Sequence, residues 1–468
     1  MRILPLNEEN RKNILEKLLK RSPASYSAYQ SSVDEIVAQV REKGDEALLA
    51  YTSRFDHVDL APEQLLVTAE EIEKACCAVG EEFLETLGRA AANIRSYHEK
   101  QKKTSWFDVT PGGSILGQKV TPIARAGVYV PGGKAAYPSS VLMNVLPAKV
   151  AGVNEIIMVT PPGKDGQVNP GVLAAAKVAG VSRVYRAGGA QAIAALAFGT
   201  ETIPRVDKIV GPGNIFVALA KKAVFGYVGI DSIAGPSEIL VLADETADPR
   251  YVAADLLSQA EHDELASAIL VTTSGKLAQE VSVLVHQQAA VLARRDIIEK
   301  SLENYGYLLV AANMDEAIET VNAIASEHME IMTRDPFLVM PRIRNAGAIF
   351  IGSYSSEPLG DYLAGPNHVL PTNGTARFFS PLSVDDFVKK SSIIAYTKEE
   401  LMAVAPDVIR FARQEGLTAH AASIEVRQRQ ETGGAGETDA VNEADAAGKK
   451  GADGRNGAAD IKGAGQEE

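Results

Sequence analysis

The feature that most constrains the fold is a repeated alternation of strand-like and helical segments between residues 125 and 352. Short apolar runs typical of buried strands end at turns that carry glycine or proline, and helical patterns follow them. The expected strands are 125–130, 155–160, 183–186, 207–210, 238–243, 268–272, 307–311 and 348–352. Such alternation with short turns is typical of parallel, doubly wound sheets. We therefore predict two α/β domains, with a break near residues 230–236.

The segments on either side of this alternation differ in kind. Residues 1–110 show apolar side chains at helical spacing, and a mainly helical segment is expected from about residue 380 to residue 429. Residues 433–468 contain nine glycines and nine alanines, and their only large aliphatic residues are Val441 and Ile461. Such a tail cannot bury enough apolar surface to offset the entropy of ordering, so we predict that it is disordered.

Composition and charge exclude several classes of protein. The net charge of −13 disfavours broad nucleic-acid binding, because phosphate contacts need lysine and arginine. We find no apolar run of about 18 residues, so no membrane span is expected. The N-terminal residues lack the apolar core of a signal peptide, which favours a cytoplasmic protein. Adjacent cysteines rarely form a disulfide bond with each other. We therefore expect Cys76 and Cys77 to pack as small apolar side chains rather than to act as catalytic thiols.

Four of the seven histidines fall in short polar segments of the second half of the chain. These are Ser-Gln-Ala-Glu-His-Asp at 258–263, Ser-Glu-His at 326–328, Gly-Asp-Tyr-Leu-Ala-Gly-Pro-Asn-His at 360–368 and Glu-Gly-Leu-Thr-Ala-His at 415–420. Imidazole and carboxylate groups bind metal ions, and they transfer protons near neutral pH. One cleft that gathers the four segments would therefore supply both kinds of chemistry.

Each segment taken alone has an ordinary explanation as well. Gln259 and His262 share a helix face, but their charged neighbours equally fit a solvated helix end, and glutamine is an unusual zinc ligand. The pair 327–328 could be a common surface motif, and 360–368 an ordinary connection rather than a binding loop. Two turns rich in glycine, at 188–189 and 211–214, each precede a helix, where phosphate binds well, but neither is a full Gly-x-Gly-x-x-Gly motif.

Taken together, six segments closely resemble the histidinol dehydrogenase family, in consistent order over about residues 1–430. They are Gly-Val-Tyr-Val-Pro-Gly-Gly (127–133), Ile-Asp-Ser-Ile-Ala-Gly-Pro-Ser-Glu (230–238), Asp-Leu-Leu-Ser-Gln-Ala-Glu-His-Asp (255–263), Ser-Glu-His (326–328), Gly-Pro-Asn-His-Val-Leu-Pro-Thr (365–372) and Glu-Gly-Leu-Thr-Ala-His (415–420). The resemblance implies oxidation of L-histidinol to L-histidine through L-histidinaldehyde, with two NAD and one water consumed, as the last steps of histidine biosynthesis.

The resemblance also implies a set of site residues. Glu327 and His328 would transfer protons. Zinc (Zn²⁺) would be held by Gln259, His262, Asp361 and His420. The substrate pocket would be lined by Ser237, Gln259, His262, His328, Asp361, His368, Glu415 and His420, and NAD would be contacted by Tyr129, Gln191 and Asn214. The family is a homodimer whose C-terminal segment crosses to the partner, so Glu415 and His420 would complete the neighbouring site.

From these inferences we expect an α/β protein with two doubly wound, Rossmann-like parallel-sheet domains. The expected segments are an N-terminal helical segment (1–23), a first α/β domain with the metal and catalytic residues (24–130 and 231–380), a second α/β domain with the NAD contacts (131–230), a helical C-terminal dimerisation segment (381–432) and the tail (433–468).

Two alternatives remain open at this point. An NAD-dependent dehydrogenase of another small polar alcohol, such as a sulfonated diol, would share the fold, although His368 and Glu415 suit a basic substrate better. A zinc hydrolase, in which Glu327 activates metal-bound water, would not need the glycine turns. A binding protein without catalysis would not need Glu327 and His328 beside a metal.

Overall fold

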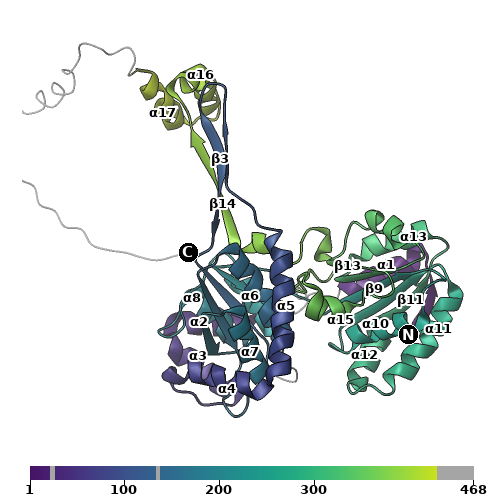
Figure 1. Cartoon of the computed structure of the whole chain (residues 1–468). Helices are drawn as coiled ribbons and strands as arrows, with labels where there is room; N and C mark the ends of the chain where they lie inside the picture. The colour runs from purple at the N-terminus through teal and green to yellow at the C-terminus, as the bar shows by residue number, and fades with distance from the viewer. Residues whose placement is uncertain (20, 22–26, 133–136, 430–468) are drawn as a thin grey trace, which may run out of the picture. The chain divides into compact units, whose positions relative to one another are not determined.

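The computed structural model describes residues 1–19, 21, 27–132 and 137–429. The chain forms two compact units, of which the first comprises residues 1–105 and 119–391 and the second comprises 106–118 and the chain from 392 onward. The first unit contains two parallel sheets, each with helices on both faces (Figure 1). The predicted tail at 433–468 lies outside the described residues.

The first sheet has six parallel strands in the order β1-β11-β10-β9-β12-β13. Its strands are β1 (Arg2–Pro5), β9 (Glu238–Ala243), β10 (Ser267–Thr272), β11 (Gly306–Val310), β12 (His328–Met332) and β13 (Ala348–Ile351). The helices that cover it are α1 (Glu8–Leu19), α10 (Pro249–Ala260), α11 (Gly275–Ala289), α12 (Arg295–Tyr305), α13 (Met314–Ile324) and the short α14 (Pro336–Val339). Helices α10, α11 and α12 share one apolar core with it, and α1 and α13 share another.

The second sheet has five parallel strands in the order β6-β5-β4-β7-β8. Its strands are β4 (Arg125–Tyr129), β5 (Glu155–Thr160), β6 (Arg183–Arg186), β7 (Lys208–Val210) and β8 (Gly229–Ile230). One core joins it to α4 (Ala69–Val79), α5 (Glu81–Glu99), α6 (Pro138–Ala151) and α7 (Pro170–Ala179). The other core joins it to α2 (Ser27–Lys43), α3 (Asp45–Asp56), α8 (Gly189–Phe198) and α9 (Ile215–Val224).

A third, small sheet has the order β14-β3-β2. Its strands are β2 (Trp106–Val109), β3 (Ile115–Pro122) and β14 (Val388–Ala395), and β2 pairs with β3 in antiparallel fashion. Two helices, α16 (Lys398–Gln414) and α17 (Thr418–Arg429), follow β14 in the second unit. The carboxylate of Glu400 on α16 accepts hydrogen bonds from the Thr110 hydroxyl and the Gly112 backbone, so α16 is tied to the turn between β2 and β3.

The α/β class with helical terminal regions is confirmed, and the structure adds strands that local periodicity did not indicate. The predicted N-terminal helical segment (1–23) begins with β1, whose four residues are mostly exposed and too few to show a period. The predicted C-terminal helical segment (381–432) contains β14 before its two helices, and neither β2 nor β3 was predicted. These strands expose their side chains on both faces, so the apolar alternation of a half-buried strand is missing.

One strand also lies in a different sheet from the one expected. Strand β4 falls within 24–130, which we assigned to the same domain as 231–380, yet it pairs with β5 and β7 of the five-stranded sheet. Helices α2 to α5, from the same range, pack on that sheet as well. Pairing between strands far apart in sequence is decided by tertiary contacts that a local pattern does not encode.

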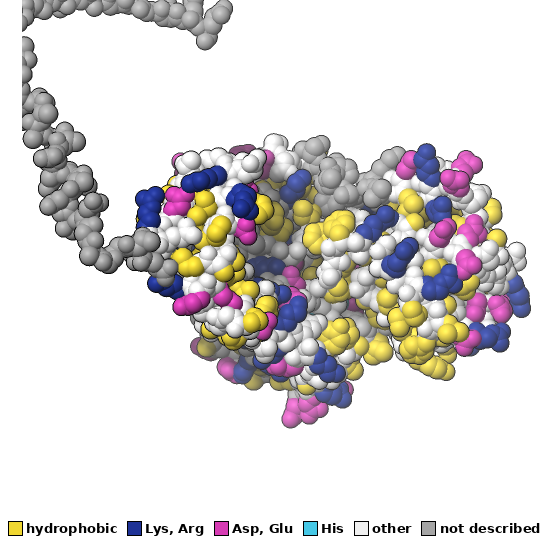
Figure 2. Space-filling view, turned by 90° about the horizontal axis from the view of Figure 1, so that it is seen from above, with side chains coloured by type: hydrophobic (Ala, Val, Ile, Leu, Met, Phe, Trp, Pro, Cys, Tyr) yellow, Lys and Arg dark blue, Asp and Glu magenta, His cyan; other side chains and the backbone are white. Residues whose placement is uncertain are grey.

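The exposed surface mixes charges of both signs. In the view of Figure 2, acidic and basic side chains lie close together, and hydrophobic patches lie between them. Among the described residues, no helix is both long and apolar enough to cross a membrane.

Candidate active site

Two predicted site segments meet at the start of neighbouring strands. His328 is the first residue of β12, Glu327 precedes it, and His328 pairs with Ile239 on the central strand β9. Ser237 directly precedes β9, and Gln259 lies in the last turn of α10, which runs back to the same edge of the sheet. The site therefore lies at the amino-terminal edge of this sheet, whereas ligands of doubly wound sheets usually bind at the carboxyl edge.

Glu327 and His328 are both buried and both bond to the main chain of Glu238. The backbone N–H of Glu238 donates to Glu327 Oε2 at 2.9 Å, and His328 Nδ1 donates to the Glu238 carbonyl at 3.1 Å. A proton on Nδ1 leaves the lone pair of the neutral ring on Nε2. That nitrogen has no hydrogen-bond partner among the described residues and lies 3.8 Å from Asp361 Oδ1. His328 Nε2 is thus placed to receive a proton.

The charges of the site shift the pKa values of its groups strongly. Burial raises the pKa of the Glu327 carboxyl to about 8, although the charge of His328 opposes the shift. Burial alone would lower the pKa of His328, but the carboxylates of Glu327 and Asp361 raise it to about 10. Burial would raise the pKa of Asp361, but three neighbouring histidines, His262 among them, lower it to about 2. Groups shifted this far are typical of functional sites.

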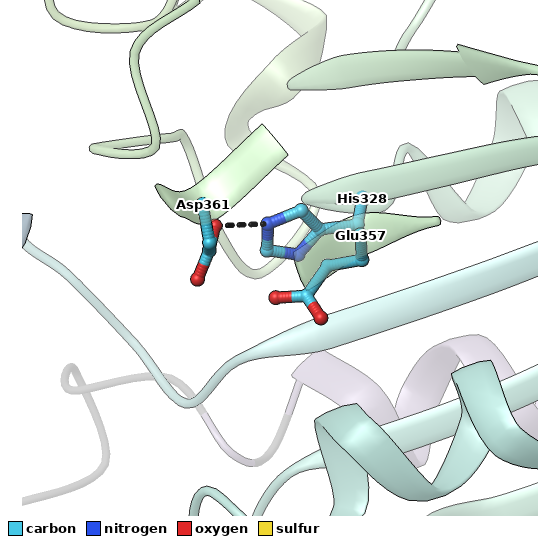
Figure 3. Close-up of side chains that lie close together, drawn as sticks. All are labelled: His328, Glu357 and Asp361. Atoms are coloured by element: carbon cyan, nitrogen blue, oxygen red, sulfur yellow. Dashed lines mark ion pairs between the residues drawn. The ribbon is translucent and has the colours of Figure 1, made fainter. Parts of the chain in front are cut away.

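Asp361 is presented by a single π-helical turn, Gly360–Ala364, of a kind that is frequent at functional sites. Figure 3 shows the carboxylate of Asp361 facing the ring of His328, with the carboxylate of Glu357 below that ring in the view. One ligand atom from each of these three residues lies within 4.8 Å of the others, close enough to hold a metal ion. His368, also in the predicted set, lies 3.7 Å from Asp361 through Nδ1 and donates to its backbone carbonyl at 3.1 Å.

The predicted ligand Gln259 is fully buried, yet among the described residues neither its Oε1 nor its Nε2 has a hydrogen-bond partner. Leaving a buried amide unpaired costs roughly 1–3 kcal/mol per group, so a bound ion, ligand or water is the expected partner. Its neighbour Ser258 donates to Glu357 Oε2 at 3.1 Å, which connects this helix end to the cluster around Asp361. His262 has an exposed side chain, and Ser237 is half-buried.

Three buried carboxyl groups beneath this cluster were missed by the sequence analysis. Glu357 caps the cluster of Figure 3, and its backbone N–H donates to Glu330 Oε1 at 3.0 Å. Glu330 in turn interacts with Asp255 on α10, and burial raises the pKa of both. A usable signal existed: Asp255 and Gln259 are four apart on one helix face, and Glu330 is two residues from His328 on one strand face.

Two predicted site residues lie outside the first unit. Glu415 is the residue after α16, and His420 lies in the first turn of α17, both in the second unit. Their side chains are exposed.

The three predicted NAD contacts line one large cavity of about 1520 Å³ at the carboxyl edge of the five-stranded sheet. Tyr129 ends β4, Gln191 lies in the first turn of α8, and Asn214 caps α9 by accepting from two backbone N–H groups. The Tyr129 hydroxyl accepts from the Gly189 N–H at 3.2 Å. Gln191 Oε1 and Asp56 Oδ2, both at the cavity, are buried without a hydrogen-bond partner among the described residues.

The comparisons with known proteins identify the family of the chain. The profile of the histidinol dehydrogenase family matches residues 19–428. The histidinol dehydrogenase of Halalkalibacterium halodurans is 58% identical over 402 residues, which cover 86% of this chain and 94% of that protein. The histidinol dehydrogenase of Bacillus subtilis is 57% identical, covering 88% and 96%. The chain belongs to the histidinol dehydrogenase family.

The fold agrees as well. The crystal structure of histidinol dehydrogenase from Elizabethkingia anophelis superposes with a TM-score of 0.87 at 36% identity, covering 92% of this chain and 99% of that chain. Membership of the histidinol dehydrogenase family makes the chain an NAD-dependent oxidoreductase of the final steps of histidine biosynthesis. The alternatives of another alcohol substrate or of a zinc hydrolase are not supported.

The residues fit both groups that histidinol dehydrogenases use. The carboxylate of Asp361 and the imidazole of His262 are ligands that zinc commonly takes, and the unpaired amide of Gln259 offers a further, less usual oxygen. The cavity exceeds the volume usual for a drug-sized ligand and contains helix N-termini and unpaired acceptors, which suits a dinucleotide.

Proposed function

We propose that the cluster around Glu327 and His328 is the active site at which L-histidinol is oxidised to L-histidine. The observation that carries this is the orientation of His328, whose Nδ1 is engaged by the Glu238 carbonyl while its buried Nε2 has no hydrogen-bond partner among the described residues. A base must have a free lone pair at the reacting atom. No cysteine takes part, since Cys76 and Cys77 lie on α4 of the other sheet.

We assign zinc to Gln259, His262 and Asp361 together with His420. Bound there, zinc would supply positive charge that holds the amino and imidazole nitrogens of the substrate. Ser237, His368 and Glu415 would line the same pocket. Support comes from the unpaired amide of Gln259 and from the low pKa of Asp361, which keeps it ionised and ready to bind a cation.

In the first oxidation, His328 takes the alcohol proton of histidinol at Nε2 while the hydride on the same carbon passes to NAD. For this the ring must be neutral. A cation held by Asp361 would offset one of the negative charges that raise the pKa of His328, next to that of Glu327, and would so favour the neutral ring. The aldehyde product stays in the buried site, away from bulk water.

In the second oxidation, Glu327 takes a proton from water as the water oxygen attacks the aldehyde carbon, and His328 returns the proton from the first step to the former carbonyl oxygen, so the hydrate forms and the ring is neutral again. Its pKa of about 8 lies close to neutral pH, where a general base and acid is most effective. The hydrated aldehyde then gives a hydroxyl proton to His328 and its hydride to a second NAD, and the carboxylate of histidine results. Both NAD molecules would bind in the cavity of Tyr129, Gln191 and Asn214.

The active form is proposed to be a homodimer in which Glu415 and His420 complete the site of the partner. The second unit supports this, because it exposes many large apolar side chains that need a partner surface. They include Trp106, Phe107, Val109, Ile394, Tyr396, Phe411 and Val426. Because histidine is consumed in translation, we place the enzyme in the cytoplasm.

The test is the number of NADH molecules formed per L-histidinol, with and without a chelator of zinc. We expect about two NADH per histidinol, loss of activity on chelation, and recovery when zinc is returned. One NADH per histidinol would contradict the role of Glu327 in the second step. Full activity of protein shown by elemental analysis to be free of metal would contradict the zinc site.

A further inference from the structure

One residue holds both members of the proposed proton-transfer pair through its main chain. The N–H of Glu238 donates to Glu327 Oε2 at 2.9 Å, and its carbonyl accepts from His328 Nδ1 at 3.1 Å. These two bonds fix the carboxylate of Glu327 and the tautomer and ring plane of His328 relative to the same peptide segment. Any movement of the main chain at residue 238 therefore displaces both groups together.

The side chain of Glu238 is anchored by a buried ion pair with Arg21. The two side chains are almost completely inaccessible, with exposed fractions of 0% for Arg21 and 3% for Glu238. Arg21 also donates to the backbone carbonyl of Leu265 at 2.7 Å, and its guanidinium lies 5.1 Å from the ring centre of Tyr305. A guanidinium fork can hold several acceptors in fixed directions. Arg21 thus ties the start of β9 to the segment that leads into β10.

Stability alone does not explain such a pair. Taking both charges out of water is costly, and buried ion pairs can often be replaced by apolar side chains of similar size without loss of stability. Burial raises the pKa of Glu238 even though Arg21 and hydrogen bonds oppose the shift, which is a sign of that cost. Unlike an apolar contact, the ion pair holds the main chain at residue 238 in a fixed direction.

We propose that Arg21 and Glu238 form a positioning pair that holds the main chain at residue 238, and through it Glu327 and His328, in the geometry needed for proton transfer. Neither side chain touches the reacting atoms in this account. The inference rests on the proposed roles of Glu327 and His328. Loss of the anchor should lower kcat for both oxidations and leave the KM values for histidinol and NAD nearly unchanged, because the groups that bind them stay in place.

The experiment compares the double variant Arg21→Met/Glu238→Met with the parent enzyme, both loaded with zinc. It removes the two charges together and keeps similar side-chain length, so neither charge is left unpaired. The matched control is Arg11→Met/Glu319→Met, an ion pair of 3.3 Å between α1 and α13 in which Arg11 is half-buried and Glu319 exposed. kcat, both KM values, zinc content and Tm are measured for each protein.

The expected result is a Tm and a zinc content near those of the parent, with kcat lowered about tenfold or more and KM changed little. The control should match the parent in every quantity. A pair that only stabilises the fold would lower Tm and leave the kcat of the folded enzyme parental, so a parental kcat in the double variant overturns the proposal. If the double variant does not fold, Arg21→Lys replaces it in the experiment. Lysine keeps the positive charge but lacks the forked guanidinium group. A parental kcat in this variant also overturns the proposal.

Failure of this inference can be told apart from failure of the proposed function. Glu327→Gln and His328→Asn test the function directly. If these two lose activity while the double variant keeps it, only the positioning pair is wrong. If Glu327→Gln and His328→Asn both keep parental activity, the assignment of the proton-transfer residues is wrong, whatever the double variant does.

Discussion

At the scale of single residues, chemistry in this site follows from burial. Glu327 is an ordinary glutamate in sequence, and it becomes a group that titrates near neutral pH because it is enclosed and bonded to only one backbone N–H. Asp361 shifts in the opposite direction because histidines surround it. Two carboxylates in one cluster can thus serve as a proton carrier and as a permanently charged ligand.

Glu327→Gln should separate the two oxidations. The amide keeps the size of the side chain but cannot take a proton from water, so the second oxidation should slow by about 10²-fold or more. The first oxidation, in which His328 is the base, should change much less. A single-turnover experiment with histidinol should then show one rapid NADH per site and an aldehyde that can be trapped. Two rapid NADH per site would argue against Glu327 as the base.

Asp56→Asn should change the dependence of stability on pH. Burial raises the pKa of the Asp56 carboxyl from 3.8 to about 6. The folded protein therefore binds this proton more tightly than the unfolded chain, so the stability it contributes is present below pH 3.8 and is lost as pH rises through about 6. Asparagine resembles the protonated form. The Tm of the variant relative to the parent, measured without NAD, should rise between pH 4 and pH 7, and a constant difference would contradict this.

At the scale of elements, the turn between β7 and α9 shows why glycine is needed beside the NAD cavity. Gly211 has φ of 117°, and a Cβ there would lie 2.1 Å from the carbonyl oxygen of Tyr129. Its N–H donates to Asp231, which is paired with the buried Lys221. The glycine pattern seen in the sequence therefore reflects close packing of two chain segments as well as helix entry.

Gly211→Ala should destabilise the protein by about 3 kcal/mol, since it combines strain at positive φ with a collision against backbone. The KM for NAD should rise as well, because Tyr129 must move. Gly226→Ala is the matched control: its φ is 101°, but a Cβ there meets nothing within 4 Å. It should cost only about 1 kcal/mol and leave the KM unchanged. Urea unfolding measures the loss of stability, and the reaction rate at varied NAD concentration gives the KM. Equal effects of the two variants on both quantities would refute the argument.

At the scale of the whole molecule, the residues proposed for the site come from both compact units. Gln259, His262, Asp361 and the proton-transfer pair belong to the first unit, whereas Glu415 and His420 belong to the second. The second unit is small and carries a high share of exposed aromatic and aliphatic side chains. Such a surface is typical of a subunit interface rather than of an isolated unit.

Mixing two inactive chains tests the shared site. Glu327→Gln disables the first unit and His420→Ala the second. After the two proteins are dissociated together and reassociated, about half of the dimers are mixed and each holds one intact site, so about a quarter of the parent activity should return. A site built within one chain predicts no recovery, since every site would then carry one of the two substitutions. Mixing without dissociation is the control.

The sequence by itself determined the α/β class, most strands of the two parallel sheets, and the histidine-bearing segments from which the site is proposed. These follow from local periodicity, glycine turns and motif order, which short stretches of chain encode. Tertiary structure alone decided that β4 joins the five-stranded sheet, that β1, β2, β3 and β14 are strands, and that Glu357, Glu330 and Asp255 lie beneath the site. The tertiary structure also brought Arg21 and Glu238 together next to the proton-transfer pair. A buried ion pair between residues 217 positions apart leaves no local pattern in the sequence. Strand pairing, burial and pKa depend on which distant residues share an environment, and only the folded chain brings them together.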